Sequence, residues 1–210
     1  SFHHLMNEVS RGEKGASDVA AYWAQQSTKY KPEDYRMQFI TNHDENSWNG
    51  TAIERMGDNR KAFAVMSFTV RGMPLIYSGQ EADMNKRLKF FEKDVIDWSN
   101  DSLADFYKNL VSIKTDHDVL FTGSIGTPIK FFDTGNERVV VYSRTSAVSE
   151  LLIMLNFSDQ EVSIDLKGDE FSGFYSSHID KGSIDANGNL HWDLPAHGYQ
   201  IFEHSIDEKY

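Results

Sequence analysis

The stretch best suited to chemistry is the segment 42–45, Asn-His-Asp-Glu, which sets an imidazole beside two carboxylates directly after an apolar run. Imidazole and carboxylate side chains can transfer protons and form hydrogen bonds, so their emergence at the end of a strand indicates a candidate site. A second apolar run, ending at Tyr77, leads in the same way into Gln80 and Glu81. Two polar segments that each follow an apolar run therefore predict one shared pocket.

The runs before both polar segments, Tyr35–Thr41 and Pro74–Tyr77, are short and apolar enough to be strands buried on both faces. Three segments have helical spacing: 18–26 after a cap at Ser17, 58–70, and 103–113 after a cap at Asp101 or Ser102. Strands that alternate with helices indicate a parallel α/β sheet. In parallel α/β barrels the reacting residues lie at the carboxyl ends of the strands, where both polar segments would fall.

After about Val119 the sequence changes period, and its short segments alternate apolar with polar residues, as antiparallel strands do. The predicted strands are 129–133, 138–143, 151–157, 161–166, 190–194 and 199–202. Turn residues at 134–136 and 187–189 separate some of them. This pattern predicts an antiparallel β-sandwich. Because no low-complexity linker joins the two halves, we expect them to pack directly on each other.

Two blocks carry a resemblance to a known family. One comprises Phe39, Asn42, His43 and Asp44, and the other comprises Gly72, Pro74, Ile76, Tyr77, Gly79 and Glu81. In type, order and separation they resemble the blocks on the seventh and eighth barrel strands of the α-amylase family, glycoside hydrolase family 13. The resemblance implies that residues 1–118 are the C-terminal part of a catalytic (β/α)8 TIM-type barrel and that residues 119–210 are the antiparallel β-sandwich that follows it.

The resemblance implies a retaining hydrolase of α-1,4-glucans such as starch and maltooligosaccharides, although transglycosylases of the family share both blocks. Asp44 would be the transition-state carboxylate. His43, Asn42, Glu81 and Trp48 would bind the substrate. For Glu81 and Gln80, ordering of the loop is an equal alternative.

Three other aromatic residues receive a packing interpretation. Phe90 and Phe91 are predicted to pack against the barrel, and the alternative is that they line an acceptor subsite together with Arg87 and Lys89. Trp98 is predicted to fill a gap between the two halves. Trp48 is the better candidate for a sugar platform, because it lies in the loop just past Asp44.

The chain lacks part of the chemistry that the resemblance implies. Retaining glycosidases need a nucleophilic carboxylate and a separate acid/base carboxylate. In the family these lie on the fourth and fifth strands, which would precede Ser1, so we expect the isolated chain to be inactive. The alternative is a non-catalytic carbohydrate-binding or scaffold protein derived from the same fold. We expect the open barrel edges to pair with the N-terminal remainder of the barrel or with a second copy of the chain.

Composition narrows the possible partners. A net charge of -11 disfavours binding to a nucleic-acid backbone, and no apolar run is long enough for a membrane span. The chain has no cysteine, which leaves the compartment undecided, with a lean towards a secreted or periplasmic bacterial protein. It opens on Ser1 without a methionine or leader pattern, so we expect the gene product to begin earlier.

No metal or other cofactor is expected in this segment, although calcium could bind elsewhere in a full-length protein. His3 and His4 are adjacent at a helix start, where their side chains do not face one another. One packed and one solvated histidine is the favoured interpretation of this pair.

Overall fold

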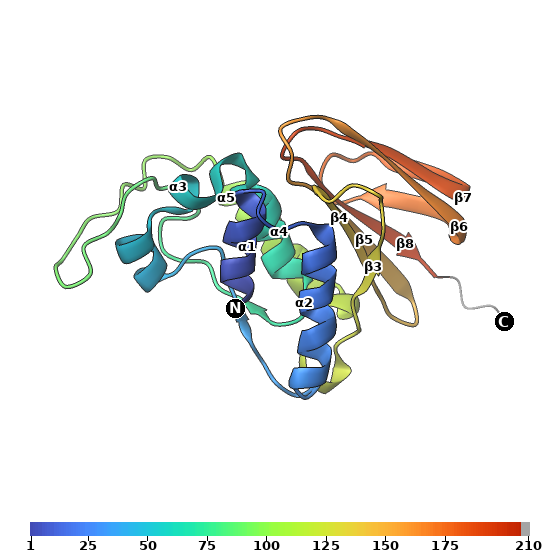
Figure 1. The fold of residues 1–210 in the computed structure, drawn as a ribbon, viewed down its shortest axis with the longest axis horizontal. Helices are drawn as coiled ribbons and strands as arrows, with labels where there is room; N and C mark the ends of the chain where they lie inside the picture. The colour runs from blue at the N-terminus through green and yellow to red at the C-terminus, as the bar shows by residue number, and fades with distance from the viewer. Residues whose placement is uncertain (207–210) are drawn as a thin grey trace.

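A computed structural model describes residues 1–206 of the chain. Helices gather at one side of the molecule and an antiparallel sheet at the other (Figure 1). The helical half contains α1 (Phe2–Ser10), α2 (Ala16–Lys29), β1 (Met37–Gln38), the π-helical turn η1 (Glu45–Asn49), α3 (Ala52–Met56), η2 (Gly57–Asn59), α4 (Arg60–Thr69), β2 (Met73–Pro74) and α5 (Ala104–Asp116). Among the described residues, no helix combines the length and apolar character that crossing a membrane requires.

The two short strands β1 and β2 pair in parallel, with α4 in the connection between them, as the α/β pattern predicts. Hydrogen bonds run from Met73 N to Arg36 O and from Leu75 N to Gln38 O, both 2.8 Å. Gly72 has a φ of +132°, and a Cβ there would lie 2.4 Å from Arg36 O, so only glycine permits this approach.

The predicted strands 35–41 and 74–77 are longer than those observed. A residue counts as strand only where a neighbour continues the hydrogen-bond ladder. Within the described residues β1 and β2 pair only with each other, so the strand assignment is limited to the few residues that pair.

Several helix boundaries differ from the predictions. The cap of α2 is Gly15, whose N–H donates to the Asp18 carboxylate at 3.1 Å, and Ser17 instead donates its hydroxyl to Glu137 at 2.9 Å. The predicted helix 58–70 begins as the 3-10 turn η2 and becomes α4 at Arg60. α5 starts at Ala104 without a side-chain cap, so neither predicted cap residue serves it.

The β half forms one curled six-stranded antiparallel sheet in the order β3-β4-β5-β8-β6-β7. It follows the short turns η3 (Asp118–Leu120) and η4 (Gly123–Ile125), and its strands are β3 (Lys130–Phe132), β4 (Val139–Thr145), β5 (Ser149–Asn156), β6 (Val162–Ser177), β7 (Ser183–Leu194) and β8 (Tyr199–Ser205). All six predicted strands are present. The turn predicted at 187–189 is wrong, because these residues lie within β7, beside a register shift in β6 between Lys167 and Ser172.

The curl creates the two layers of the predicted sandwich. β6 pairs with β7 along much of its length but with β8 only at 175–177, so the β6–β7 hairpin folds over the rest of the sheet. A buried cluster fills the space between the layers, with Val141 and Met154 from one side and Ile164 and Leu190 from the other.

A second buried cluster joins the two halves directly, as the absence of a linker predicts. Phe63 of α4 stacks on Phe157 with ring centroids 4.3 Å apart, and both are fully buried. Tyr142 and Ile153 of the sheet belong to the same cluster as the helices. The face of the sheet opposite the hairpin is therefore covered by the helical half.

Candidate functional site

The pair His43–Asp44 lies just beyond the carboxyl end of β1, where the first polar segment was expected. Their side chains are 66% and 58% exposed, and His43 Nε2 lies 3.6 Å from Asp44 Oδ2. Because both side chains are exposed and neither forms a hydrogen bond within residues 1–206, they can contact a ligand without breaking a buried network.

Asn42 has a structural contact rather than an open side chain. Its Oδ1 accepts a hydrogen bond from Glu45 N at 2.8 Å, and its carbonyl accepts from Asn46 N at 2.9 Å. These bonds start the helical turn that continues as η1. Asn42 thus fixes the turn from which His43 and Asp44 project, and its predicted role in substrate binding stays a prediction.

A buried arginine that the sequence did not reveal holds this segment against the helices. Arg55 donates to Ile40 O at 2.9 Å, to Gly50 O at 2.9 Å and to Asn7 Oδ1 at 3.0 Å. The two carbonyls flank the segment that carries His43 and Asp44. One guanidinium therefore fixes both ends of the candidate site.

Arg55 also contacts His3, with Nη1 2.7 Å from the Nε2 of the imidazole. Burial first, and then the Arg55 charge, lower the pKa of His3 to about 4. His3 is therefore neutral near pH 7 and accepts from the guanidinium through Nε2. It is buried and His4 is exposed, which confirms the expected packed and solvated pair.

The long connection between β2 and α5 is tied to the candidate site and reaches out beside α3 (Figure 1). The Asn46 side chain donates to Lys86 O at 3.1 Å and accepts from Leu88 N at 2.7 Å, and Ser47 donates to Leu88 O at 2.7 Å. These bonds bring residues 86–91 over the segment that follows Asp44.

This arrangement assembles an exposed aromatic cluster of Trp48, Phe90 and Phe91 beside His43. Ring centroids are 5.3 Å apart for Trp48 and Phe90, 4.8 Å for Phe90 and Phe91, and 5.8 Å for His43 and Phe90. Phe90 and Phe91 are 38% and 86% exposed, so in the described part of the chain they do not pack against the barrel as predicted. Trp98 is 57% exposed and does not fill a gap between the halves.

The carboxyl ends of the two strands meet, as expected. Thr41, Tyr77 and Gln80 line the same small hollow. Gln80 accepts from Tyr77 N at 3.0 Å and donates to the Tyr107 hydroxyl at 2.9 Å, contacts that order the loop. Glu81 Oε2 is buried without a hydrogen-bond partner in the described part of the chain. No described hydrogen bond joins Glu81 to the segment 42–48.

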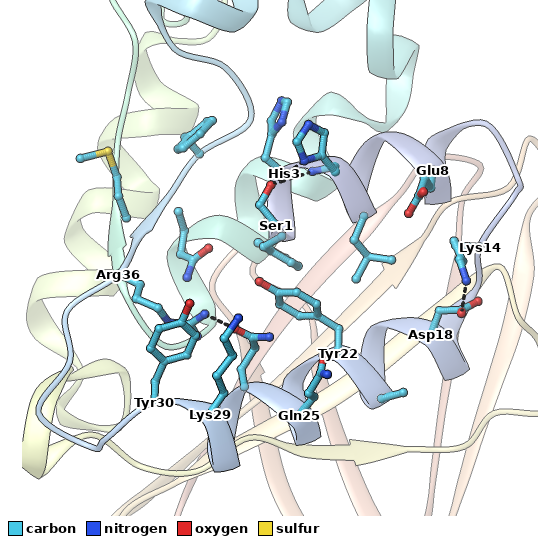
Figure 2. Close-up of a pocket in the computed structure, with 18 residues that line it drawn as sticks. Ser1, His3, Glu8, Lys14, Asp18, Tyr22, Gln25, Lys29, Tyr30 and Arg36 are labelled. Carbon is cyan, nitrogen blue, oxygen red and sulfur yellow. Dashed lines mark hydrogen bonds and ion pairs between the residues drawn. The ribbon is translucent and has the colours of Figure 1, made fainter.

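A large hollow lies away from Asp44, between α1, α2 and β1 (Figure 2). It measures about 850 Å³, and Arg36–Phe39 form part of its wall. Figure 2 shows Tyr30 and Arg36 at one end and Ser1 and His3 at the other. A second hollow of about 630 Å³ lies beside β2 and includes Met73 and Pro74. Each strand of the two-stranded sheet is thus bordered by a hollow.

The sequence of the chain is similar to those of known amylases. Residues 129–201 match the family described as the maltogenic amylase C-terminal domain. The chain is 28% identical over 169 residues to "Alpha-amylase 2" of Dictyoglomus thermophilum, covering 72% of the chain and 28% of that protein. It is also 28% identical to "Alpha-amylase MalA" of Haloarcula japonica, covering 62% of the chain and 19% of that protein.

Solved structures of amylases share the fold of the chain. A maltogenic α-amylase of Thermotoga neapolitana superposes on 97% of the chain with a TM-score of 0.80 at 16% identity. In sequence and in fold, the chain is thus similar to the C-terminal part of α-amylase-family glycoside hydrolases. The chain covers 49% of the Thermotoga structure and less than a third of either curated relative.

Proposed function

We propose that the chain is part of a longer α-amylase-like retaining hydrolase of α-1,4-glucans, in which Asp44 is the transition-state carboxylate. The observation that carries this proposal is the exposed His43–Asp44 pair at the carboxyl end of a parallel strand, next to the exposed rings of Trp48, Phe90 and Phe91. Aromatic faces stack on sugar rings, and the carboxylate accepts hydrogen bonds from sugar hydroxyls.

In this proposal Asp44 accepts hydrogen bonds from hydroxyls of the sugar at the cleavage point, and His43 donates one to the same sugar. These bonds tighten as the ring flattens towards an oxocarbenium-like transition state, so they accelerate the reaction rather than only bind the substrate. A nucleophile and an acid/base on preceding strands would carry out bond cleavage. Trp48 would support the substrate beyond the cleavage point.

The proposed barrel part spans residues 1–118, and the β-sandwich spans 119–210. The two-stranded parallel sheet supports this division, because a barrel strand needs a neighbour on each side. The hollow beside β1 would receive the strand that precedes it in the barrel, and the hollow beside β2 would receive the first strand. The exposed side chains of Met37 and Met73 lie along the same sheet.

The isolated 210-residue chain is expected to release no reducing sugar from starch or maltooligosaccharides. Asp44 and His43 can orient a sugar, but neither protonates the leaving oxygen nor forms the glycosyl-enzyme intermediate. A reducing-sugar assay on the purified chain measures this, with the Asp44→Asn chain as the contamination control. Turnover that disappears in Asp44→Asn would show that a complete site lies within these residues.

In the isolated chain, backbone amides of the proposed barrel part are expected to exchange faster than those of the β-sandwich, unless the chain self-associates. The sheet of β1 and β2 has open edges, whereas the β-sandwich encloses its own core. Amide exchange combined with light scattering tests this: residues 35–41 and 72–77 should exchange faster than β4, β5 and β8, unless the chain dimerises. A monomer with uniform protection would contradict the proposed barrel edge.

A further inference from the structure

Two histidines and a glutamate meet where the helical half joins the sheet. His117 ends α5, His178 lies in the turn between β6 and β7, and Glu203 lies on β8. Their side chains are 14%, 24% and 29% exposed, so the group is sheltered but reachable from solvent. This cluster lies outside the candidate sugar site and belongs to none of the contacts described there.

The three potential ligand atoms converge on one point. Glu203 Oε2 lies 3.0 Å from His178 Nε2 and 3.4 Å from His117 Nε2, and one potential ligand atom of each residue lies within 4.8 Å of those of the other two. Zinc bonds of about 2.0–2.2 Å to nitrogen and oxygen in a tetrahedral site place ligand atoms about 3.3–3.6 Å apart. The distance from Glu203 to His117 already falls in this range, and the distance from Glu203 to His178 falls about 0.3 Å short of it.

Hydrogen bonds fix the tautomer of His117 and the position of His178. His117 Nδ1 lies 3.0 Å from Ile113 O, and a carbonyl can only accept, so Nδ1 carries the proton. His117 Nε2, the other ring nitrogen, is directed towards Glu203 Oε2 at 3.4 Å. Backbone and amide bonds hold His178, with its N–H on Ile201 O at 2.9 Å and its carbonyl on Asn109 Nδ2 at 3.0 Å.

We propose that His117, His178 and Glu203 bind a divalent transition-metal ion, Zn²⁺ by preference, with water as the fourth ligand. Imidazole nitrogens select zinc over calcium or magnesium, which prefer oxygen ligands. The bond from His117 Nδ1 to a backbone carbonyl is the usual support for a metal-binding imidazole. With all three protein positions on different elements, the ion would tie α5 to β8 and to the β6–β7 turn. The expectation that this segment holds no metal would then be wrong.

Neither of the other histidine clusters in the described residues offers an equivalent site. His3, His4 and Glu45 also come close together, but the Arg55 guanidinium occupies His3 Nε2 at 2.7 Å and would repel a cation. His191 lies between Asp165, 2.8 Å from its Nδ1, and Asp193, 3.6 Å from its Nε2. These two carboxylates are on opposite sides of the ring, so they cannot share one ion with it.

Isothermal titration of the metal-free chain with Zn²⁺ tests the proposal, using His178→Gln and Glu203→Gln as ligand variants and His191→Gln as the matched control. We expect one Zn²⁺ per chain for the wild type and the control, and at least a tenfold loss of affinity in each ligand variant. At a Zn²⁺ concentration about 100-fold above Kd, the Tm of the wild type should rise by about 5–10 °C.

Substitution with Co²⁺ supplies a second measurement, because the intensity of its visible absorption reports tetrahedral coordination by nitrogen and oxygen. This band should be present in the wild type and in His191→Gln and absent from His178→Gln. Far-UV circular dichroism of the metal-free variants checks that they are folded. Wild type that binds no Zn²⁺, or ligand variants that bind it as tightly as the wild type, would overturn the proposal.

Discussion

In the longer protein proposed above, Asp44→Asn lowers kcat by about 10²–10³ while KM changes by a factor of a few. Loss of one group that acts only in the transition state typically has an effect of this size. The amide keeps the shape of the carboxylate but removes the charge that a flattened, positively charged sugar requires. Steady-state hydrolysis of a maltooligosaccharide measures both constants.

Asp159→Asn is the matched control for this experiment, because Asp159 is an exposed aspartate in the β half, between β5 and β6. It should leave kcat and KM unchanged. An Asp44→Asn enzyme with near-normal kcat and only weakened binding would place Asp44 outside the reaction centre. That result would favour the alternative of a carbohydrate-binding protein that kept the fold and lost the chemistry.

Arg144→Met is expected to destabilise the chain by about 3 kcal/mol, because three acceptors lose their donor and each such loss costs about 1–3 kcal/mol. Arg144 is fully buried, and its guanidinium donates to Thr69 O at 3.1 Å, Phe121 O at 3.1 Å and Thr127 Oγ1 at 3.0 Å. Methionine fills much of the same volume but leaves these acceptors without a donor. Urea unfolding followed by circular dichroism measures the difference.

The environment of Arg144 makes two opposing contributions to stability. Burial lowers its pKa to about 10, so holding the charge in this site costs stability, and its hydrogen bonds to three uncharged oxygens offset that cost. Thr69 is the last residue of α4, so the charge also lies at the negative end of that helix. Arg11→Met, at an exposed arginine paired with Glu13, should not move the unfolding midpoint. Equal midpoints for both variants would contradict this account of Arg144.

The features that the sequence predicted well depend on local pattern. The strands of the β half follow from alternation of apolar and polar residues, and the parallel pair follows from apolar runs separated by a helix. Gly72 and Pro74 follow the predicted helix 58–70, where a glycine and a proline indicate that a helix ends. The second role of Gly72, close approach of β2 to Arg36 O, depends on a neighbour distant in the chain.

The features that the sequence missed depend on contacts between distant residues. Arg55 bonds to residues of α1 and to the end of β1, and Asn46 bonds to a loop 40 residues later. Nothing in the spacing of these polar residues distinguishes them from surface residues. The exposure of Phe90 and Phe91 was missed for a related reason, because aromatic composition favours burial and only the tie from Asn46 to Leu88 places this loop beside Trp48.

The most direct test of the central proposal is a crystal structure of the longer protein with a bound maltooligosaccharide. The account predicts that Asp44 and His43 both lie within hydrogen-bond distance, about 2.6–3.2 Å, of hydroxyls on a single glucose ring. Trp48 or Phe90 should contact a neighbouring ring. A sugar bound in the barrel mouth without contact to Asp44 would contradict the proposed role of this residue.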